Sequence, residues 1–455
     1  MQRTHLFSRP ALLPLGLGSA CLLSLSSVSA AQSAPTAPLH RVNAHEPHLV
    51  VRLLPGQSPD ALAASLGGTV LRSRPAQGIH LIDVPGASTS VAESLAWALK
   101  GLPTVLYSEV DQIVDPPESL TCEVPETSLA AMQCTVPFID GAPAPGTYGM
   151  QAAVEQISAS EATALATGIP MVVAVIDTGL DLSHPLFENR IAPGGYDYVL
   201  GLEGGADVGN GLDDDGDGAI DEAVGHGSHV AGLVALVDPA AMILPMRALD
   251  GDGYGSAFLV ASAIYDAVDS GATTINLSLS TRLGCNVLAE ALMYAEYRGV
   301  DVITSSGNSG DDVQFPGCFQ PADYPSLDPT WLPAGTVLTG ANLLTVAGVD
   351  IDDAKPVFAC SGPEVDLVAP GVDVYSAHMG GEYAWWSGTS MSSGLAAGSV
   401  SYLKSIWSQG SHSGSAQELL QATTDNIDAK NPGLSGKLGT GRIDLEEAVK
   451  QLLGI

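Results

Sequence analysis

Three short strings of the sequence each contribute one polar residue of a nucleophilic triad. The strings are Ile-Asp-Thr-Gly at 176–179, Gly-His-Gly-Ser-His at 225–229 and Gly-Thr-Ser-Met-Ser at 388–392. A serine hydroxyl is a weak nucleophile at neutral pH, and it needs an imidazole to accept its proton and a carboxylate to orient that imidazole. Asp177, His226 and Ser390 supply these groups, in this order along the chain. We therefore interpret them as the catalytic residues of a covalent hydrolytic mechanism.

The segments around the triad favour an α/β fold with its site at the carboxyl ends of parallel strands. Residues 171–176 form a continuous apolar run, which is typical of a buried parallel strand, and Asp177 follows at its end. In open α/β sheets, sites assemble at this edge. Apolar segments with helical character follow the other two strings, at 229–236 and 395–400. Ser390 is thus predicted to lie at a helix N-terminus, where backbone N–H groups stabilise an oxyanion.

These motifs resemble those of the subtilisin-like serine proteases, or subtilases, and the resemblance covers about residues 148 to 450. It implies a three-layer α/β domain with a mainly parallel central sheet, and serine endopeptidase activity through an acyl-enzyme intermediate. Asn308, in the string Ser-Ser-Gly-Asn at 305–308, matches the residue that donates its side-chain amide to the oxyanion. The backbone N–H of Ser390 would be the second donor. One such donor lowers the barrier by about 3–4 kcal/mol.

Two further strings resemble the edges of the family's substrate groove. The resemblance assigns substrate binding to Gly253, Tyr254, Gly255, Ser278, Leu279 and Ser280. The two glycines would let a peptide backbone approach closely and pair as an added strand. An ordinary loop between a strand and a helix at 249–256 is the alternative interpretation.

The sequence departs from the family pattern just after the nucleophile. The family usually has Ala-Ser-Pro-His after the methionine, whereas this chain has Ser-Ser-Gly-Leu at 392–395. Gly394 and Leu395 thus replace a proline that shapes the nearby backbone and a histidine outside the triad. The predicted function is a secreted serine endopeptidase made as an inhibited precursor. The alternative is a catalytically impaired relative with the same fold that binds peptides.

The first part of the chain is predicted to direct the protein out of the cell. Residues 1–30 have a basic start, a Leu-rich apolar run and small residues before a cleavage site after Ala30, as in a secretory signal peptide. A retained membrane anchor and lipoprotein processing at Cys21 are the alternatives. The expected location is therefore extracellular or periplasmic.

Two more units precede the catalytic domain, which is predicted to span 148–455. The pattern over 45–115 predicts a β-α-β-β-α-β order, that is, a small ferredoxin-like α+β domain. This domain resembles the inhibitory propeptide of the family, and a stable accessory domain is the alternative. Residues 116–147 are rich in Pro, Ala and Gly, so we expect an exposed linker that contains the processing site.

An acidic loop between the Asp and His strings resembles a calcium-binding frame. The candidate ligands are the carboxylates of Asp213, Asp215, Asp217 and Asp221 and the carbonyl of Ala219. Carboxylates packed this closely repel one another unless a hard cation collects their oxygens. The frame is incomplete because Val224 stands where the bidentate Glu belongs. A structural Ca²⁺ and no organic cofactor are expected, and an acidic surface loop without metal is the alternative.

Charge and cysteine usage limit the partners. The chain has 50 Asp and Glu against 17 Lys and Arg, which argues against nucleic acid or an anionic membrane as a partner. No run after the signal is long enough to span a membrane, so the mature form is expected to be a soluble monomer that acts on proteins or peptides.

Spacing suggests the disulfides Cys122–Cys134 and Cys285–Cys318, with Cys360 as a buried free thiol.

Overall fold

The computed structural model describes residues 42–116, 137–141, 146–324, 327, 329, 331–333, 335–408 and 414–455. The predicted signal peptide, most of the predicted linker, and Cys122 and Cys134 lie outside the described residues.

The N-terminal unit is a four-stranded sheet with two helices. Its elements are β1 (Leu49–Leu53), α1 (Pro59–Ser65), β2 (Thr69–Arg74), β3 (Ile79–Asp83), α2 (Thr89–Leu99) and β4 (Val105–Val110). The strand order is β2-β3-β1-β4, and neighbouring strands are antiparallel. Leu49 and Val51 pack with the buried alanines of α1 and α2, whereas Val50 on the opposite face joins a core that the large domain shares. The predicted β-α-β-β-α-β order is present.

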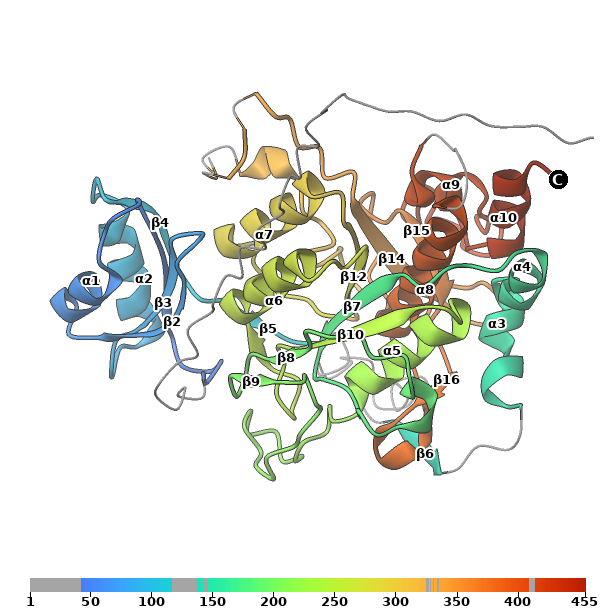
Figure 1. Ribbon diagram of the computed structural model, residues 1–455, viewed down its shortest axis with the longest axis horizontal. Helices are drawn as coiled ribbons and strands as arrows, with labels where there is room; N and C mark the ends of the chain where they lie inside the picture. The colour runs from blue at the N-terminus through green and yellow to red at the C-terminus, as the bar shows by residue number, and fades with distance from the viewer. Residues whose placement is uncertain are drawn as a thin grey trace, which may run out of the picture. The chain divides into compact units, whose positions relative to one another are not determined.

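The large domain is built on an eight-stranded sheet in the order β15-β14-β13-β12-β7-β10-β8-β9 (Figure 1). All neighbouring strands are parallel except the last pair, β8 and β9. The strands are β7 (Val172–Asp177), β8 (Tyr196–Asp197), β9 (Leu202–Glu203), β10 (Met242–Arg247), β12 (Thr274–Leu277), β13 (Asp301–Ser305), β14 (Leu343–Val349) and β15 (Leu367–Pro370).

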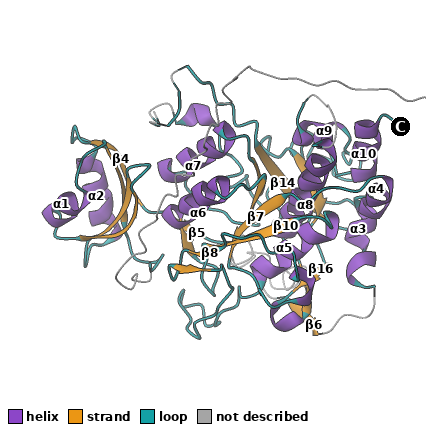
Figure 2. Ribbon diagram, in the orientation of Figure 1, coloured by secondary structure: helices purple, strands orange, loops and turns teal. Residues whose placement is uncertain are grey.

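Helices cover both faces of this sheet (Figure 2). One face packs on α5 (His226–Val237) and α8 (Thr389–Trp407), and the other on α6 (Ala257–Asp269) and α7 (Asn286–Tyr297). Alternate residues of β7 pack against the helices on the two faces, because successive side chains of a strand point in opposite directions. Val173 and Val175 thus join the core with α5, and Ala174 and Ile176 join the core with α6. The predicted three-layer α/β fold with a mainly parallel sheet is confirmed.

Smaller elements complete the described structure. The helices are α3 (Ala152–Gln156), α4 (Ala159–Leu165), α9 (Ala416–Ala422) and α10 (Leu445–Leu453), with 3₁₀ turns at Tyr148–Met150, Pro185–Phe187, Pro321–Asp323 and Met379–Gly381. A three-stranded sheet joins β16 (Val374–Ala377), β17 (Tyr383–Trp386) and β6 (Phe138–Gly141), and a two-stranded one joins β5 (Ile113–Val114) and β11 (Gly255–Ser256).

The helices α5 and α8 pack closely because α8 presents two glycines to α5. A Cβ on Gly394 would lie 3.2 Å from the carbonyl oxygen of Val230, and one on Gly398 would lie 2.8 Å from the Cβ of Val237. Leu395 is fully buried in the core between the helices and the sheet. The departure from the family pattern at Gly394 and Leu395 therefore lies in the packing of α8 against its neighbours.

One predicted disulfide is not formed. Cys285 and Cys318 are free thiols, so the pairing inferred from their spacing is wrong. Cys285 directly precedes α7, is buried in the core beneath α6 and α7, and burial raises the pKa of its thiol well above the usual value. Cys360 is a buried free thiol, as predicted.

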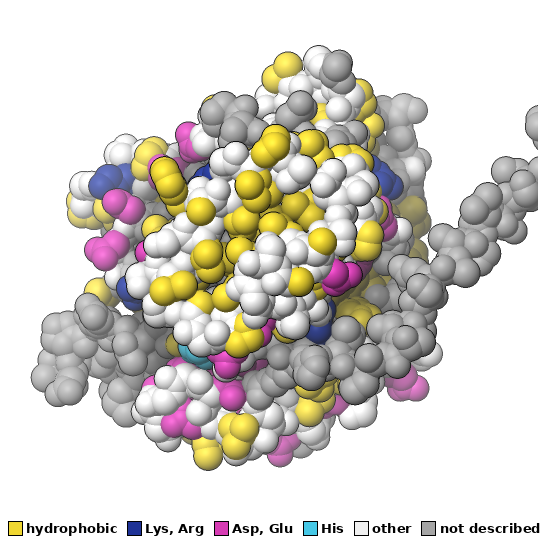
Figure 3. All heavy atoms as spheres, turned by 90° about the vertical axis from the view of Figure 1, so that its left-hand side faces the viewer, with side chains coloured by type: hydrophobic (Ala, Val, Ile, Leu, Met, Phe, Trp, Pro, Cys, Tyr) yellow, Lys and Arg dark blue, Asp and Glu magenta, His cyan; other side chains and the backbone are white. Residues whose placement is uncertain are grey.

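The surface reflects the acidic composition. On the face that Figure 3 shows, Asp and Glu side chains are scattered among uncharged and hydrophobic atoms, and Lys and Arg are fewer. Within the described part of the chain, no helix combines the length and the apolar character that crossing a bilayer requires.

Candidate active site

The carboxylate of Asp177 and the imidazole of His226 form a buried pair. Asp177 is the last residue of β7 and His226 is the first residue of α5, and both side chains are fully buried. His226 Nδ1 lies 2.7 Å from Asp177 Oδ1, and the backbone N–H of Thr178 donates to the same oxygen at 2.7 Å. Because a carboxylate only accepts, this contact fixes the proton on Nδ1 and makes Nε2 the basic nitrogen.

Two glycines bring the start of α5 against the end of β7. A Cβ on Gly227 would lie 2.2 Å from the carbonyl oxygen of Gly179 and 3.1 Å from the Cβ of Asp177. Gly225 has a φ of +99°, which favours glycine, and a Cβ there would overlap the ring of His378. A side chain at Gly227 would therefore force the start of α5 away from the end of β7, and one at Gly225 would have to displace His378.

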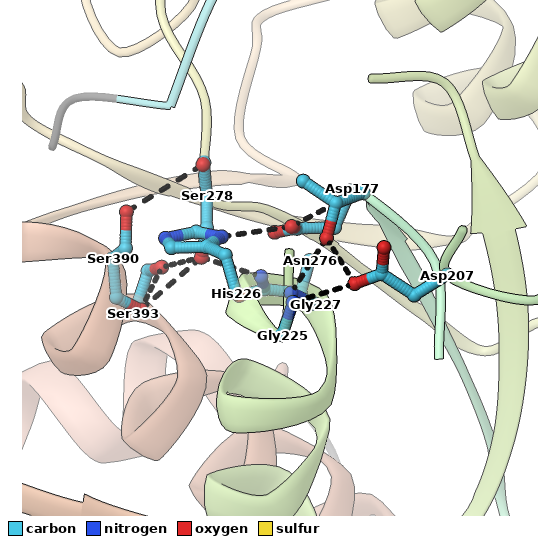
Figure 4. Close-up of polar contacts among 10 residues, drawn as sticks. Asp177, Asp207, Gly225, His226, Gly227, Asn276, Ser278, Ser390 and Ser393 are labelled. Carbon is cyan, nitrogen blue, oxygen red and sulfur yellow. Dashed lines mark hydrogen bonds and ion pairs between the residues drawn. The ribbon is translucent and has the colours of Figure 1, made fainter. Parts of the chain in front are cut away.

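Ser390 lies in the first turn of α8, on the other side of the imidazole. Figure 4 shows the ring of His226 between Asp177 and Ser390. Ser390 is fully buried, and its hydroxyl is 3.5 Å from the carbonyl oxygen of Ser278. The structure thus brings together the three residues that the sequence strings singled out.

A network of side chains ties this turn of α8 to the end of β12. Ser393 Oγ donates to the carbonyl of Ser390 at 3.0 Å and lies 2.8 Å from Ser278 Oγ. Asn276 Nδ2 donates to Ser278 Oγ at 2.8 Å. Because Ser278 also belongs to a predicted substrate edge, the same hydrogen-bond network holds the nucleophile and that edge.

Asn308 lies next to the nucleophile on the loop that follows β13. Its side chain is buried, and its Oδ1 accepts hydrogen bonds from the backbone N–H of Thr389 at 3.0 Å and from Thr389 Oγ1 at 2.8 Å. With Oδ1 held in this way, the N–H groups of Nδ2 are the donors that Asn308 can offer to a substrate oxygen. Its position beside the N-terminus of α8 suits the predicted oxyanion role.

A strand that follows the N-terminal unit lies between the two predicted substrate edges. Val114 pairs with Gly255 in the antiparallel ladder of β5 and β11. On the other side, the N–H of Asp115 donates to the carbonyl of Ser280 at 3.1 Å, and the N–H of Ser280 donates back at 2.7 Å. Gly253 also faces this segment, since a Cβ on it would lie 2.8 Å from the ring of Pro116. Both edges therefore bind extended backbone.

The side chains of the other two edge residues, Leu279 and Tyr254, contact the core and the N-terminal unit. Leu279 is fully buried in the core below. The ring of Tyr254 packs at a tilt of 56° against the ring of His45, with centroids 4.7 Å apart, and its backbone N–H donates to Asp250.

Several side chains around the triad were not singled out from the sequence. Trp386 of β17 packs edge-on against His226, with ring centroids 5.2 Å apart and planes at 89°. His229 is buried and its Nε2 lies 3.1 Å from the carbonyls of Val374 and Ala384; burial lowers its pKa to about 3, so it stays neutral. Asp207 lies behind Asp177, and burial raises its pKa to about 7.

The acidic loop brings carboxylates together in two overlapping groups. Possible ligand atoms of Asp213, Asp215 and Asp252 lie within 4.8 Å of one another, as do those of Asp215, Asp217 and Glu222. Burial, followed by the carboxylates of Asp252 and Asp217, raises the pKa of Glu222 to about 7. Such crowding of oxygens is the environment that a hard divalent cation prefers.

The loop differs in two ways from the predicted ligand set. Asp221 belongs to neither group, because its carboxylate accepts hydrogen bonds from the backbone N–H groups of Asn210 and Gly211, at 2.8 and 2.7 Å. The N–H of Ala219 donates to Asp217 at 2.7 Å, and the role of its carbonyl as a ligand stays a prediction. Asp252, which the sequence pattern missed because it lies far along the chain, is fully buried and accepts from the N–H of Asp221 at 2.6 Å.

Comparison with known proteins finds the same family that the sequence motifs resemble. Residues 168–441 match the subtilase family. The chain is 34% identical to a thermophilic serine proteinase of Bacillus sp. (strain AK1) over 287 residues, which cover 61% of each protein. It is 31% identical to thermitase of Thermoactinomyces vulgaris over 313 residues, which cover 67% of this chain and 95% of thermitase.

A solved structure shares the fold. Fervidolysin from Fervidobacterium pennivorans, described as a keratinolytic enzyme related to subtilisin, aligns with a TM-score of 0.65 and 21% identity. The alignment covers 89% of this chain and 61% of fervidolysin.

Proposed function

The chain belongs to the subtilase family of serine endopeptidases, and we propose that it cuts proteins or peptides with Asp177, His226 and Ser390 as its triad. The observation that carries this proposal is the 2.7 Å contact between Asp177 and His226, with Ser390 at a helix N-terminus on the far side of the imidazole.

The chemistry follows from these positions. Ser390 Oγ attacks the substrate carbonyl while His226 Nε2 takes the hydroxyl proton, and Asp177 stabilises the imidazolium that forms. Asn308 Nδ2 and the backbone N–H of Ser390 donate to the tetrahedral oxyanion. His226 then gives its proton to the leaving amine, which leaves an acyl-enzyme. Water activated by the same imidazole attacks this ester and releases Ser390.

We further propose that the protein is made as an inhibited precursor. The strand around Val114 and Asp115 occupies both substrate edges, so a peptide cannot pair there at the same time. Two contacts hold this unit on the helices α6 and α7. Arg52 forms a buried ion pair with Glu290 at 3.0 Å, and Arg74 binds both oxygens of Asp266 at 2.9 and 2.7 Å.

Carboxylates of the same unit reach the N-termini of these two helices. Glu109 accepts from the N–H groups of Asn286 and Val287, both at 2.8 Å, and Asp111 accepts from the N–H of Phe258 at 3.0 Å. Negative groups at helix N-termini are stabilised by the orphan donors and the helix dipole. The proposal assigns residues 45–115 as inhibitor, 116–147 as the linker with the processing site and 148–455 as the catalytic domain. It also places the mature monomer outside the cell after loss of a signal at 1–30.

We propose Ca²⁺ as a structural ion in the acidic loop. Glu222 Oε2 is buried and lacks a hydrogen-bond partner, and it belongs to one of two overlapping groups that together contain five carboxylates, which fits an oxygen-seeking cation. Asp213, Asp215, Asp217, Glu222 and Asp252 would hold the ion. When bound, it would neutralise the repulsion among these groups and fix the loop that leads to His226.

Peptide cleavage by the purified, processed protein tests the proposed function. Wild type should hydrolyse an unfolded protein such as reduced casein, and Ser390→Ala protein processed by an added protease should not. Equal cleavage by both proteins would assign the activity to a contaminant. No cleavage by a wild type that lacks its N-terminal unit would favour a peptide-binding relative.

A further inference from the structure

A second buried aspartate lies behind the Asp177–His226 pair. Asp207 follows β9 on an irregular segment and is 5% exposed. Its Oδ2 accepts two hydrogen bonds, from Thr178 Oγ1 at 2.8 Å and from the backbone N–H of Gly225 at 2.8 Å (Figure 4). Gly225 directly precedes His226, so the bond from Gly225 holds the backbone immediately before the catalytic base.

The second bond, from Thr178 Oγ1, leads to Gly227, the residue that directly follows His226. Thr178 Oγ1 accepts a hydrogen bond from the backbone N–H of Gly227 at 3.1 Å, and the backbone N–H of Thr178 donates to Asp177 Oδ1 at 2.7 Å. A single carboxylate oxygen of Asp207 therefore connects to the residues on both sides of His226. Through Thr178 it also connects to the carboxylate that the imidazole contacts.

The backbone of Asp207 is itself fixed to the segment after Asp177. Its N–H donates to the carbonyl of Leu180 at 3.0 Å, and the N–H of Leu180 donates to the carbonyl of Gly205 at 3.1 Å. Gly179 leaves room for this close approach, since a Cβ on it would lie 2.6 Å from the nitrogen of Asp207. The backbone of Asp207 is thus held directly beside the segment that follows Asp177.

Charge is a separate property of this carboxyl group. Burial raises the pKa of Asp207 to about 7, Gly225, Thr178 and the guanidinium of Arg247 act against that shift, and Asp177 adds to it. Asp207 Oδ1 is buried and has no hydrogen-bond partner, so both bonds of the anchor are made by Oδ2 alone. A neutral group with one acceptor oxygen at this place could make the same two bonds.

We propose that Asp207 is a positioning residue, which holds the backbone on both sides of His226 so that the imidazole stays aligned with Asp177 and Ser390. The proposal rests on the proposed function and adds a residue to it. Asp207 touches no substrate, and it acts through Gly225 and Thr178. The acceptor oxygen, and not the charge, carries this role.

The test compares substitutions that remove or keep the acceptor. Asp207→Ala should lower kcat about 10²-fold with little change in KM, because a displaced base costs that much even for a small shift. Asp207→Asn should recover most of this loss, since its amide oxygen can accept both bonds. Thr178→Val should lower kcat less than Asp207→Ala, and Thr178→Ser, which keeps the hydroxyl, should match wild type.

Asp238 provides a matched control at the opposite end of α5. It is fully buried, directly follows α5, and accepts hydrogen bonds from Ser401 Oγ at 2.6 Å and the N–H of Ala240 at 3.1 Å. Asp238→Ala should reduce the melting temperature and leave kcat unchanged. This separates a loss of alignment from a general loss of stability.

A spectroscopic readout reports alignment even without turnover. The proton on His226 Nδ1, shared with Asp177, should give a low-field ¹H NMR signal that is retained in Asp207→Asn and Asp238→Ala and lost or shifted in Asp207→Ala. Wild-type kcat and an unchanged signal in Asp207→Ala would overturn the proposal, as would an Asp207→Asn enzyme as slow as Asp207→Ala. If Asp207→Ala does not fold, equal kcat for Thr178→Val and Thr178→Ser overturns it. A wild type that shows the signal but cuts no peptide would instead contradict the proposed function.

Discussion

Asp115 and Ser280 are antiparallel partners that exchange two backbone hydrogen bonds, of 3.1 and 2.7 Å. The pair joins the N-terminal unit to the strand end that also supports the nucleophile. Two residues before Ser280, the carbonyl of Ser278 lies 3.5 Å from Ser390 Oγ. The register of this pairing therefore relates any bound peptide to the catalytic serine.

The first prediction is the position of self-processing. In an antiparallel ladder, each step forward along one strand is a step back along the other. Asp115 pairs with Ser280, so in the same register the residue at position 117 lies opposite Ser278. The peptide bond after that residue then lies next to Ser390. For this chain, the count predicts a cut after Pro117, so the mature protein should begin at Glu118.

Mass spectrometry of the secreted product measures this N-terminus. Ser390→Ala protein, produced in a host without other proteases, should remain uncut. A mature N-terminus well beyond residue 118 would show that the strand inhibits the enzyme without being its substrate.

The second prediction concerns release of the cut N-terminal unit as the pH rises. Burial against α6 raises the pKa of Asp111 from 3.8 to about 7 in the assembled protein. A pKa that is higher in the complex means that the complex binds a proton more tightly than the separated parts. The affinity is therefore greatest below the usual pKa of the carboxyl and falls up to about tenfold per pH unit until the pH passes about 7.

Size-exclusion chromatography of the cut protein between pH 5 and pH 8 measures this release. Asp111→Asn, which cannot titrate, should weaken the dependence, and the remainder should come from Glu109 and Glu290, whose pKa values burial also raises. Asp60→Asn at an exposed position of α1 should not change it. A wild type whose N-terminal unit stays bound to the catalytic domain more completely at pH 8 than at pH 5 would contradict the prediction.

The third prediction is that Ca²⁺ stabilises the mature enzyme through the acidic loop. Ligand at 100 times its Kd adds about 2.7 kcal/mol, which corresponds to a rise of about 5 °C in melting temperature for a domain of this size. Asp215→Ala/Asp217→Ala should abolish the shift, and so should Asp252→Ala, which removes the oxygen ligands of the carboxylate that the proposed site takes from outside the loop.

Thermal unfolding with Ca²⁺ and with chelator measures the shift. Asp352→Ala, at an exposed acidic position in another loop, is the control and should keep it. A shift that survives both loop substitutions would place the ion elsewhere.

The fourth prediction tests Asn308. Its Nδ2 is proposed to contact only the oxyanion that forms in the transition state, so Asn308→Ala should lower kcat about 10²–10³-fold and leave KM nearly unchanged. Thr389→Ser, which keeps the hydroxyl that holds Asn308 Oδ1, should retain activity near that of wild type. Steady-state kinetics on one peptide give both constants, and a loss confined to KM would assign Asn308 to substrate binding.

The sequence predicts those parts of the structure that local patterns encode. The apolar run at 171–176 and the polar residue after it predict β7 and the place of Asp177, because a buried strand must be apolar on both faces. The glycines beside His226 and the small residues of α8 mark places where backbones meet closely. These signals lie within a few residues of the features they predict.

Contacts between distant segments were not predictable in the same way. Asp207 lies on an irregular segment 29 residues after Thr178, and only folding brings their side chains together. Asp252 joins the acidic loop from another strand end, and Trp386 reaches His226 from β17. The Cys285–Cys318 pairing was wrong because spacing along the chain does not report whether two thiols meet in space.

Covalent trapping of Ser390 tests the central claim most directly. The processed enzyme, treated with a phosphonylating serine reagent and digested, should carry one label, on the peptide that contains Ser390. His226→Ala should be labelled far more slowly, because the hydroxyl then lacks its base, and Ser390→Ala should not be labelled. Labelling of the processed wild type at another residue, or equal labelling of Ser390→Ala, would contradict the assignment of Ser390 as the nucleophile of a serine endopeptidase.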